Sequence, residues 1–391
     1  MDVRLIVLAL GAFAGTMESA VLPGLLPAIG TEMGVTVAQA GLLVFAYSVA
    51  YSLSAPIISS LFSSVDRRTT LVVAELVFGL SALAMALLHV FDLIVVARGM
   101  LAVAAVLFTS TAQATAYAIS PPDRRGRAVG FVVTGATLAV ALGAPAGAVL
   151  GLNYGWRLTF GIIAALAVAS GLVMALRLPK GLANERHSFA ERLAVLKQPG
   201  VGLALMISLI TALGVFPPGI YFASLTTDVM HMDIAGIPVV MLSAGIGAVA
   251  GSTLGGQMTD RMGVFPAVIL LSIAVTVLLA AMSAVTLLPA SLVPPFWVVL
   301  YGLLSFAGWG LYSAQVGLLG GLAPQAVTLA ISLNLTSSNF GGAIAAVIGG
   351  QVIERLGGGS LGLVCAGFCA VSLALLFLNR RTFARVGRSE R

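Results

Sequence analysis

Long apolar runs alternate with short polar connections along the whole chain. Each run holds about 20 residues or more, which is enough for an α-helix to cross the hydrocarbon core of a bilayer. The first run is too long for a signal-peptide core, so it is counted as a true span. The pattern predicts an all-α polytopic membrane protein with twelve transmembrane helices, at residues 5–29, 38–62, 69–90, 92–117, 127–151, 157–178, 201–226, 235–258, 264–287, 292–319, 325–352 and 358–379.

Composition supports a membrane protein and argues against a soluble one. Of the 391 residues, 59% are hydrophobic and only 9% are charged, against roughly 25% charged residues in soluble domains. The 45 glycines suit helices that pack closely in a membrane. Cys365 and Cys369 lie on one helix face in the last run, and we expect them to be small core residues.

The charges give the expected orientation. The net charge of +6 could suggest nucleic acid, but the basic residues gather in alternate short connections, which marks those connections as cytoplasmic. We therefore expect a lipid bilayer and no nucleic acid as partner, with both termini cytoplasmic. The basic side carries Arg4, Arg67, Arg68, Arg124, Arg125, Arg127 and Arg261, and the opposite side carries Glu32, Asp92, Asp228 and Asp233.

An internal repeat divides the chain into two halves. A small-residue helix end that breaks into an Asp-Arg turn occurs at 55–71 and again at 251–266, and glycine-rich spans correspond at 135–151 and 337–352. Two repeated halves with a site between them are a known transporter plan. The repeat predicts two pseudo-symmetric six-helix bundles, at 1–178 and 201–391, joined by a cytoplasmic linker at 179–200, with a basic cytoplasmic tail.

Three motifs carry a family resemblance. The fifth span reads GATLAVALGAPAGAVLG and is followed by GWRLTF at 155–160; the second-half loop reads GGQMTDRMG at 255–263; and the fourth span carries ARGMLAVAA at 97–105. Together they resemble the major facilitator superfamily, and within it the twelve-span drug:proton antiporters of the bacterial inner membrane, in the arabinose-efflux and chloramphenicol-exporter branch. The first-half loop departs from the family pattern, because Ser63 stands where the motif aspartate belongs, and Ala102 replaces a usual glycine in the fourth span.

The resemblance implies where the gate and the cavity lie. Spans one, four, seven and ten would line a central cavity, and the glycine-rich fifth span is associated with exporters. Generic glycine packing and a plain topology signal remain open alternatives for these motifs. The residues implied in gating are Arg67, Arg68, Gly143, Pro145, Gly147, Asp260 and Arg261.

Glu18 is the main candidate for coupling transport to protons. It interrupts the first apolar run near the bilayer midplane, where an ionisable group is costly and usually functional. Arg98 in the fourth span resembles the family's motif arginine, and we expect it to have a role in proton coupling or gating. The alternative is that Arg98 reaches outward to water from its place about a turn and a half inside the span. Glu75, in the third span, is expected to be a structural hydrogen-bonding residue.

Aromatic, methionine and amide side chains at membrane depth are candidates for substrate contact. Such a lining suits bulky, partly apolar compounds, although ordinary packing would also explain each of them. The predicted substrate-binding residues are Phe13, Met17, Tyr47, Tyr51, Thr109, Gln113, Phe216, Tyr221, Trp309, Tyr312, Gln315, Asn334, Ser338 and Asn339.

The function expected from these features is proton-coupled export of small amphipathic or cationic compounds by a monomer. The proton gradient is the expected energy source, since the sequence has no nucleotide-binding loop. No cofactor and no metal are expected. An exporter of a sugar, metallophore or other metabolite on the same fold is the alternative. A membrane enzyme would need paired histidines or a nucleophile constellation, which we do not find, and the repeat argues against a receptor that only binds.

Overall fold

The computed structural model describes residues 3–62, 65–121, 124–182 and 198–383, and the regular structure in these ranges is helical. The predicted linker and the basic tail lie largely outside the described residues, as does Ser63. Within the described ranges, twelve helices are long and apolar enough to cross a membrane. The prediction of an all-α protein with twelve spans is therefore confirmed.

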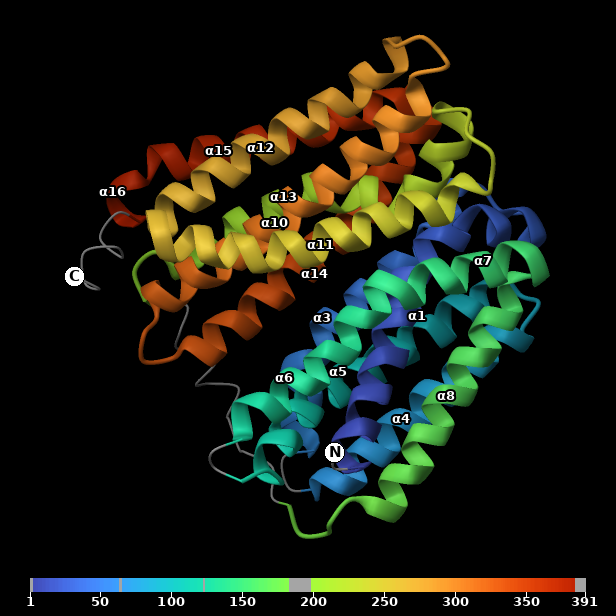
Figure 1. The fold of residues 1–391 in the computed structure, drawn as a ribbon, viewed down its shortest axis with the longest axis vertical. Coiled ribbons are helices and arrows are strands. Elements are labelled where there is room, and N and C mark those ends of the chain that lie inside the picture. The colour runs from blue at the N-terminus through green and yellow to red at the C-terminus, as the bar shows by residue number, and fades with distance from the viewer. Residues whose placement is uncertain (1–2, 63–64, 122–123, 183–197, 384–391) are drawn as a thin grey trace. The chain divides into compact units, whose positions relative to one another are not determined.

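Two compact units make up the chain (Figure 1). The first comprises residues 1–35 and 46–189, and the second comprises residues 36–45 and 190–391. In the first half of the sequence the helices are α1 (Val3–Met33), α2 (Val37–Ala40), α3 (Leu42–Leu61), α4 (Arg67–Leu87), α5 (Phe91–Ala118), α6 (Arg125–Leu138), η3 (Ala139–Gly143), α7 (Ala144–Tyr154) and α8 (Trp156–Arg177), of which α2 and the first four residues of α3 belong to the second unit. Those of the second half are α10 (Val201–Ser224), η5 (Leu225–Val229), α11 (Gly236–Met262), α12 (Val264–Ala284), η6 (Val285–Leu287), α13 (Val293–Leu322), α14 (Val327–Leu356), η7 (Gly358–Ser360), α15 (Leu361–Leu378) and α16 (Arg380–Phe383).

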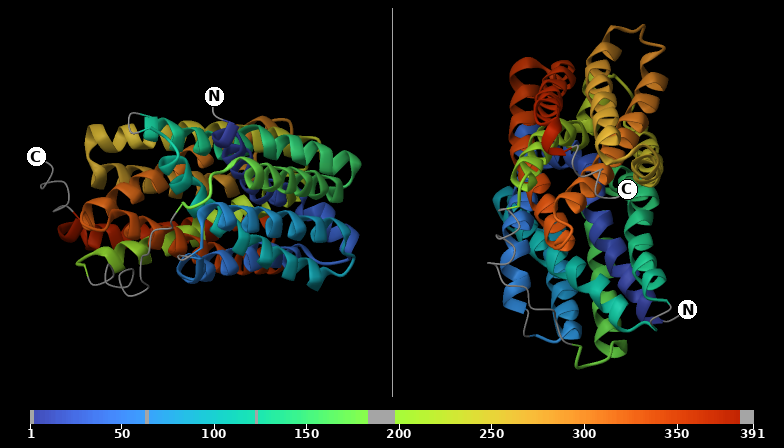
Figure 2. Two further views of the ribbon diagram at one scale, coloured as in Figure 1. Left: turned by 90° about the horizontal axis from the view of Figure 1, so that it is seen from below. Right: turned by 90° about the vertical axis from the view of Figure 1, so that its left-hand side faces the viewer.

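The two halves repeat the same helix packing. In the first, α1 packs against α6 and α8, and α4 packs against α5 and α8. In the second, α10 packs against α14 and α15, and α12 packs against α13 and α15, which are the equivalent pairs. Within each unit the long helices lie side by side along their length (Figure 2). The predicted pseudo-symmetry of two six-helix bundles is thus present in the packing itself.

Several spans are longer than the hydropathy pattern predicted. The first was expected to end at residue 29, but α1 continues through Pro23 and Pro27 to Met33. A proline removes one backbone hydrogen bond, and membrane helices tolerate this loss because neighbouring helices and local adjustments satisfy the freed groups. The helix ends before Gly34, whose φ of 66° suits a residue without a β-carbon.

Glycine allows two helices of the second unit to touch along their backbones. Gly247, Gly251 and Gly255 lie one turn apart on α11, and a β-carbon at any of them would collide with the backbone of α13 near Gly302, Phe306 and Gly310. Small residues at this spacing let membrane helices approach closely. The second-half loop motif therefore begins inside a packing seam.

Candidate functional site

Glu18 on α1 and Arg98 on α5 form an ion pair, joined through Oε1 of the carboxylate and Nη1 of the guanidinium. Glu18 is fully buried and Arg98 is 2% exposed. A lone charge in such a place costs several kcal/mol, on the order of 3–5 when its partner is removed, so each residue makes the other tolerable. The sequence predicted both as coupling residues but not that they touch. Since Arg98 is buried, it does not reach outward to water.

A tyrosine completes this cluster. The ring of Tyr47 on α3 lies over the Arg98 guanidinium, with Cζ 4.4 Å from the ring centroid, and Tyr51 stacks on Tyr47 at 5.8 Å between centroids. A desolvated cation over an aromatic face gains roughly 2 kcal/mol. Three helices of the first unit, α1, α3 and α5, thus meet at Arg98. Within the described residues, the second carboxylate oxygen of Glu18, Oε2, has no hydrogen-bond partner.

The glycine-rich fifth span packs against the helix that carries Glu18. A β-carbon added at Gly143 would lie 2.8 Å from Cζ of Phe13, and one added at Gly147 would lie 2.8 Å from Cε of Met17. The five residues of η3 that end at Gly143 form a π-helical turn just before the buried Pro145; a proline and a π-turn are both common causes of a helix bend. Phe13 and Met17 therefore pack directly against the glycines of this motif.

The basic turn between α3 and α4, which carries Asp66, Arg67 and Arg68, is held by hydrogen bonds between these side chains and backbone groups. Asp66 caps α4 by accepting a hydrogen bond of 2.7 Å from the backbone N–H of Arg68, and it also accepts one from the N–H of Gly181. Arg67 donates to the carbonyl of Ala114 at 2.8 Å, and Arg68 donates to the carbonyl of Ala175. The turn is therefore bonded to α5, to α8 and to the residues that follow α8. The carboxylate of this turn comes from Asp66.

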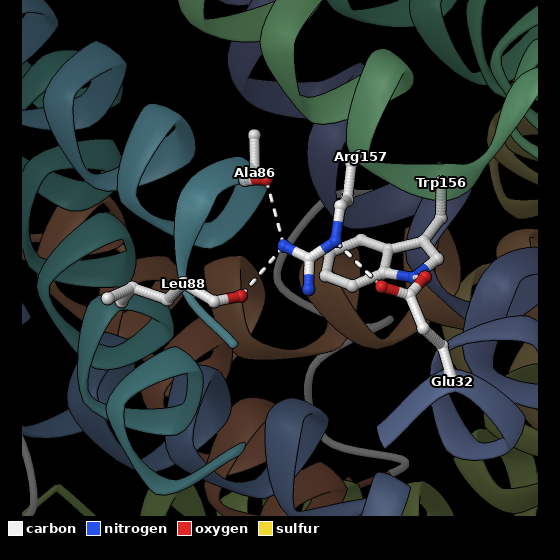
Figure 3. A network of polar contacts seen from close by, with 5 residues as sticks. All are labelled: Glu32, Ala86, Leu88, Trp156 and Arg157. Atoms are coloured by element: carbon white, nitrogen blue, oxygen red, sulfur yellow. Dashed lines mark hydrogen bonds and ion pairs between the residues drawn. The ribbon is translucent and has the colours of Figure 1, made fainter. Parts of the chain in front are cut away.

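A second polar network connects helix ends at the opposite end of the same unit (Figure 3). Glu32 near the end of α1 accepts hydrogen bonds from the indole N–H of Trp156 at 2.6 Å and from Nε of Arg157 at 2.8 Å. Arg157 also donates through Nη1 to the carbonyls of Ala86 at 2.8 Å and Leu88 at 2.7 Å, at the end of α4. Its guanidinium stacks over Trp156, 4.5 Å from the ring centroid. The GWR sequence after the glycine-rich span thus joins three helix ends.

In the second unit, hydroxyl and amide groups link three helices. The hydroxyls of Thr211 on α10 and Ser372 on α15 are 2.7 Å apart, and Nε2 of Gln315 on α13 donates to Thr211 at 3.4 Å. All three side chains are buried. Only Gln315 was predicted. Thr211 and Ser372 were missed because a single hydroxyl in an apolar helix usually bonds to its own backbone, and Thr211 also does that.

Several other predicted substrate residues of this unit make contacts with helix backbone or glycine. Tyr221 is 1% exposed and donates to the carbonyl of Ala346 on α14, while Phe216 lies against Gly342. Asn339 donates to the carbonyl of Leu335 on its own helix. Asn334 differs from them, because it is fully buried and neither atom of its amide has a hydrogen-bond partner among the described residues. Ser338, one turn further on, is also buried.

The remaining candidates lie on surfaces of the chain. Trp309 is 47% exposed and meets Tyr312 edge to face at 6.2 Å between centroids. The exposed polar candidates are Thr109 and Gln113 on α5 and Asp260 and Arg261 at the end of α11. The structure therefore brings Glu18, Arg98 and Tyr47 together in a buried cluster. The exposed candidates of this paragraph remain open to substrate, lipid or water.

Comparisons with known proteins agree with the fold and with the family resemblance. The family model of the Major Facilitator Superfamily matches residues 8–287. The chain is 30% identical to a chloramphenicol resistance protein of Streptomyces lividans over 383 residues, covering 96% of this chain and 95% of that protein. It is 29% identical to the inner membrane transport protein YdhP of Escherichia coli K12 over 382 residues, covering 96% of each chain.

Solved structures match over the whole length as well. A bacterial homologue of the human lysosomal transporter Spinster, in an inward-facing and occupied conformation, superposes with a TM-score of 0.78 at 16% identity, covering 98% of this chain and 97% of that one. A D-xylose–proton symporter superposes with a TM-score of 0.73 at 15% identity, covering 95% and 96%. At these identities the likeness establishes the fold alone.

Proposed function

The chain belongs to the major facilitator superfamily and is a membrane transporter rather than an enzyme, and from this premise we propose that it exports small amphipathic or cationic compounds in exchange for protons. The observation that carries the proposal is the buried cluster of Glu18, Arg98 and Tyr47. An ion pair without access to bulk water is costly to build, and ionisable residues inside membrane helices usually serve a transport step. Glu18 is the proposed proton carrier.

Charge balance explains how this cluster exchanges one ion for another. The pair of Glu18 carboxylate and Arg98 guanidinium has no net charge. A proton bound to Glu18 brings one positive charge, and a monovalent cationic substrate bound beside the carboxylate brings the same charge. Binding both would leave two positive charges together in a medium of low dielectric constant, which is strongly unfavourable. Proton and substrate therefore exclude one another, which is the requirement for antiport.

Protonation also alters the contacts of Arg98. When Glu18 is neutral, the guanidinium loses its charged partner and keeps its contact with the face of Tyr47. Because Glu18 lies on α1, Tyr47 on α3 and Arg98 on α5, a change at one carboxyl group alters the balance of contacts among three helices. Alternating access requires such a local event to bias the packing of whole helices.

The location and the energy source form part of the same proposal. Basic connections on one side predict cytoplasmic termini in a bacterial cytoplasmic membrane, and the Escherichia coli relative is described as an inner membrane protein. We propose the proton gradient as the energy source, no cofactor, and a monomer as the working unit. The exposed side chains of Thr109, Gln113 and Trp309 are the proposed substrate contacts that the packing leaves available.

A second candidate is export of a sugar or another specific metabolite. The chain is 26% identical to a probable sugar efflux transporter of Mannheimia succiniciproducens over 397 residues, and the exposed amide and hydroxyl of α5 suit a hydroxylated ligand. The two candidate functions differ in the range of compounds that the protein would transport. A drug exporter protects cells against several unrelated amphipathic compounds, whereas a sugar exporter protects only against sugars and their analogues.

The experiment is a susceptibility panel in an efflux-deficient host, followed by ethidium efflux in everted vesicles. Cells carrying the wild-type chain, Glu18→Gln and Glu354→Gln are compared; Glu354 is an exposed glutamate on α14 and serves as the matched control. We expect Glu18→Gln to lose at least about tenfold in proton-driven efflux, since it removes a group on which the coupled step depends, and the control to retain it. Proton-dependent efflux at the wild-type rate in Glu18→Gln contradicts the proposal.

A further inference from the structure

Glu75, like Glu18, is a carboxylic acid buried within the first unit. Among the described residues, only Glu18 and Glu75 have buried carboxyl groups, at 0% and 2% exposure. Both belong to the first unit and both side chains lie at α1: Glu18 is part of that helix, and Glu75 approaches it from α4. Glu18 has Arg98 as its counter-ion, whereas no lysine or arginine of the described chain pairs with Glu75.

In the described part of the chain, Glu75 contacts glycine and phenylalanine, and one hydroxyl lies within hydrogen-bond distance of its carboxyl group. Its Oε1 occupies the space where a β-carbon of Gly11 would stand, beside the ring of Phe108. Gly171 on α8 packs against its Cβ, and the hydroxyl of Ser170 lies 3.1 Å from its Oε2. A carboxylate in such a place would have one hydrogen bond and no cation, which leaves most of its desolvation cost uncompensated.

The Ser170 hydroxyl has one proton and faces two acceptor oxygens. The Ser170 hydroxyl lies 2.9 Å from the carbonyl of Ala167 and 3.1 Å from Glu75. A hydroxyl has one proton and two acceptor positions, so it satisfies both neighbours when it donates to the carbonyl and accepts from a protonated carboxyl group. This geometry therefore favours a protonated Glu75 in a buried site.

Glu75 and Glu18 lie along the same face of α1. Gly11, Gly15 and Glu18 follow one another at helical spacing on that face, and the three are met by Glu75, Phe78 and Arg98 in turn. The seven residues from Gly11 to Glu18 correspond to about 10 Å along the helix. In the other direction, Glu75 is eight residues, or about 12 Å, from the basic turn at Arg67. Glu75 therefore lies between Glu18 and the end of the unit that carries Arg67 and Arg68.

We propose that Glu75 relays protons between Glu18 and the basic end of the first unit, a role that rests on the proposed proton-coupled transport. The neutral Glu75 releases its proton toward that end, and the resulting carboxylate takes a proton from the neutral Glu18 through water that enters during the transport cycle. Glu18 is then ionised and pairs again with Arg98. In these steps one proton leaves the path from Glu75 and one moves from Glu18 to Glu75, so Glu75 is neutral again and Glu18 is ionised. Uptake of one proton by Glu18 in the other half of the cycle restores its neutral form.

Glu75→Gln separates this role from a structural one. The amide matches the neutral acid in shape and donates the same hydrogen bond to Ser170, so a purely structural Glu75 is replaced without loss. We expect ethidium efflux driven by a proton gradient in everted vesicles to fall at least about tenfold, while ethidium exchange without a gradient stays within about twofold. Glu75→Asp keeps a carboxyl group and should retain part of the driven efflux. Ser170→Ala, which keeps Glu75 itself, should retain most of it.

Two results overturn the relay. One is driven efflux at the wild-type rate in Glu75→Gln, and the other is an equal loss of driven efflux and exchange, which would mark a packing defect. The parallel Glu18→Gln variant keeps the two proposals apart: if it alone loses driven efflux, the relay is wrong and the transport mechanism stands, and if both variants keep it, the transport mechanism is wrong as well.

A measurement without substrate tests the same point. Infrared spectra of the purified protein in liposomes should contain the C=O band of a protonated carboxyl group that disappears in Glu75→Gln and persists in Glu18→Gln. On transfer to D₂O the band should shift rapidly, because a relay must exchange its proton with water. A Glu75 band that does not shift, or no such band, overturns the relay whatever compound the protein transports.

Discussion

Gly147 of the fifth span lies in direct contact with Met17 of the first, the residue immediately before Glu18. A β-carbon at Gly147 would lie 2.8 Å from Cε of Met17, 2.9 Å from Cγ2 of Val21 and 3.2 Å from Cγ2 of Thr159. The glycine-rich motif therefore sets the position of the helix that carries the proposed proton carrier. This contact gives the motif a physical role within one unit, independent of any role in the direction of transport.

Gly147→Ala should destabilise the protein, because three side chains must move to admit one methyl group. Overpacking of this kind costs about 1–3 kcal/mol. We expect a lower unfolding temperature of the purified protein in detergent and slower efflux. Gly161→Ala is the matched control, since nothing lies within 4 Å of a β-carbon at Gly161 and alanine favours a helix over glycine. Equal stability of the two variants would show that the Met17 contact is not tight.

Local sequence patterns predicted the helices well, for a physical reason. A bilayer imposes one length and one polarity on every span, so twelve apolar runs translate directly into twelve helices. The pairing of Glu18 with Arg98 could not be read from the sequence, since it depends on the rotation of two helices 80 residues apart in the chain. Tyr221 was predicted to contact substrate, but hydropathy does not reveal that its ring lies against Gly349. Hydropathy locates a helix and leaves its rotation undetermined.

Arg98→Lys should impair the coupling cluster although it keeps the charge. A guanidinium is planar and offers several donors, so it bonds to Glu18 while it stacks on Tyr47; the compact ammonium group of lysine cannot do both equally well. We expect efflux to fall and the unfolding temperature to drop. Arg98→Gln should be worse, because it leaves the Glu18 carboxyl group without a partner, at a cost of about 3–5 kcal/mol.

The double variant Glu18→Gln with Arg98→Gln tests whether this loss comes from the ion pair. With both charges removed, stability should recover most of what Arg98→Gln alone loses, since neither group is then a buried unpaired charge. Additive losses in the double variant would mean that the two residues act independently. Efflux should stay low in the double variant, because the proposed proton carrier is absent.

Arg157→Lys should loosen the end of the first unit that Figure 3 shows. Arg157 bonds to two carbonyls of the α4 end and to Glu32 at once, and a lysine cannot hold all three acceptors in that geometry. Glu32→Gln should cost less, because the Glu32 side chain is 43% exposed and its ion pair is weakened by solvent. Unfolding temperatures in detergent measure both effects, with Arg355→Lys on the exposed end of α14 as control.

Asp66→Ala should free the residues that follow α8. It removes the N-cap of α4, a loss of about 0.5–2 kcal/mol, together with the bond to the N–H of Gly181. We expect faster trypsin cleavage after Lys180, the residue before Gly181, on a gel time course. Asp260→Ala, an exposed aspartate at the end of α11, should leave this rate unchanged. No change in the Asp66 variant would show that the bond to Gly181 does not restrain the chain.

Asn334→Leu distinguishes a structural amide from a functional one. An amide buried without hydrogen-bond partners costs about 1–3 kcal/mol, and Asn334 has none among the described residues. Leucine has the same branched arrangement of four heavy side-chain atoms and no polar atoms, so the variant should be as stable as the wild type or more stable. If the amide serves substrate or water during transport, efflux should fall while stability rises.

Asn339→Leu is the control: that amide bonds to its own helix, so its loss should lower stability slightly and leave efflux intact. Lower stability in Asn334→Leu would contradict the expectation, because it would mean that the amide has a partner that stabilises the fold.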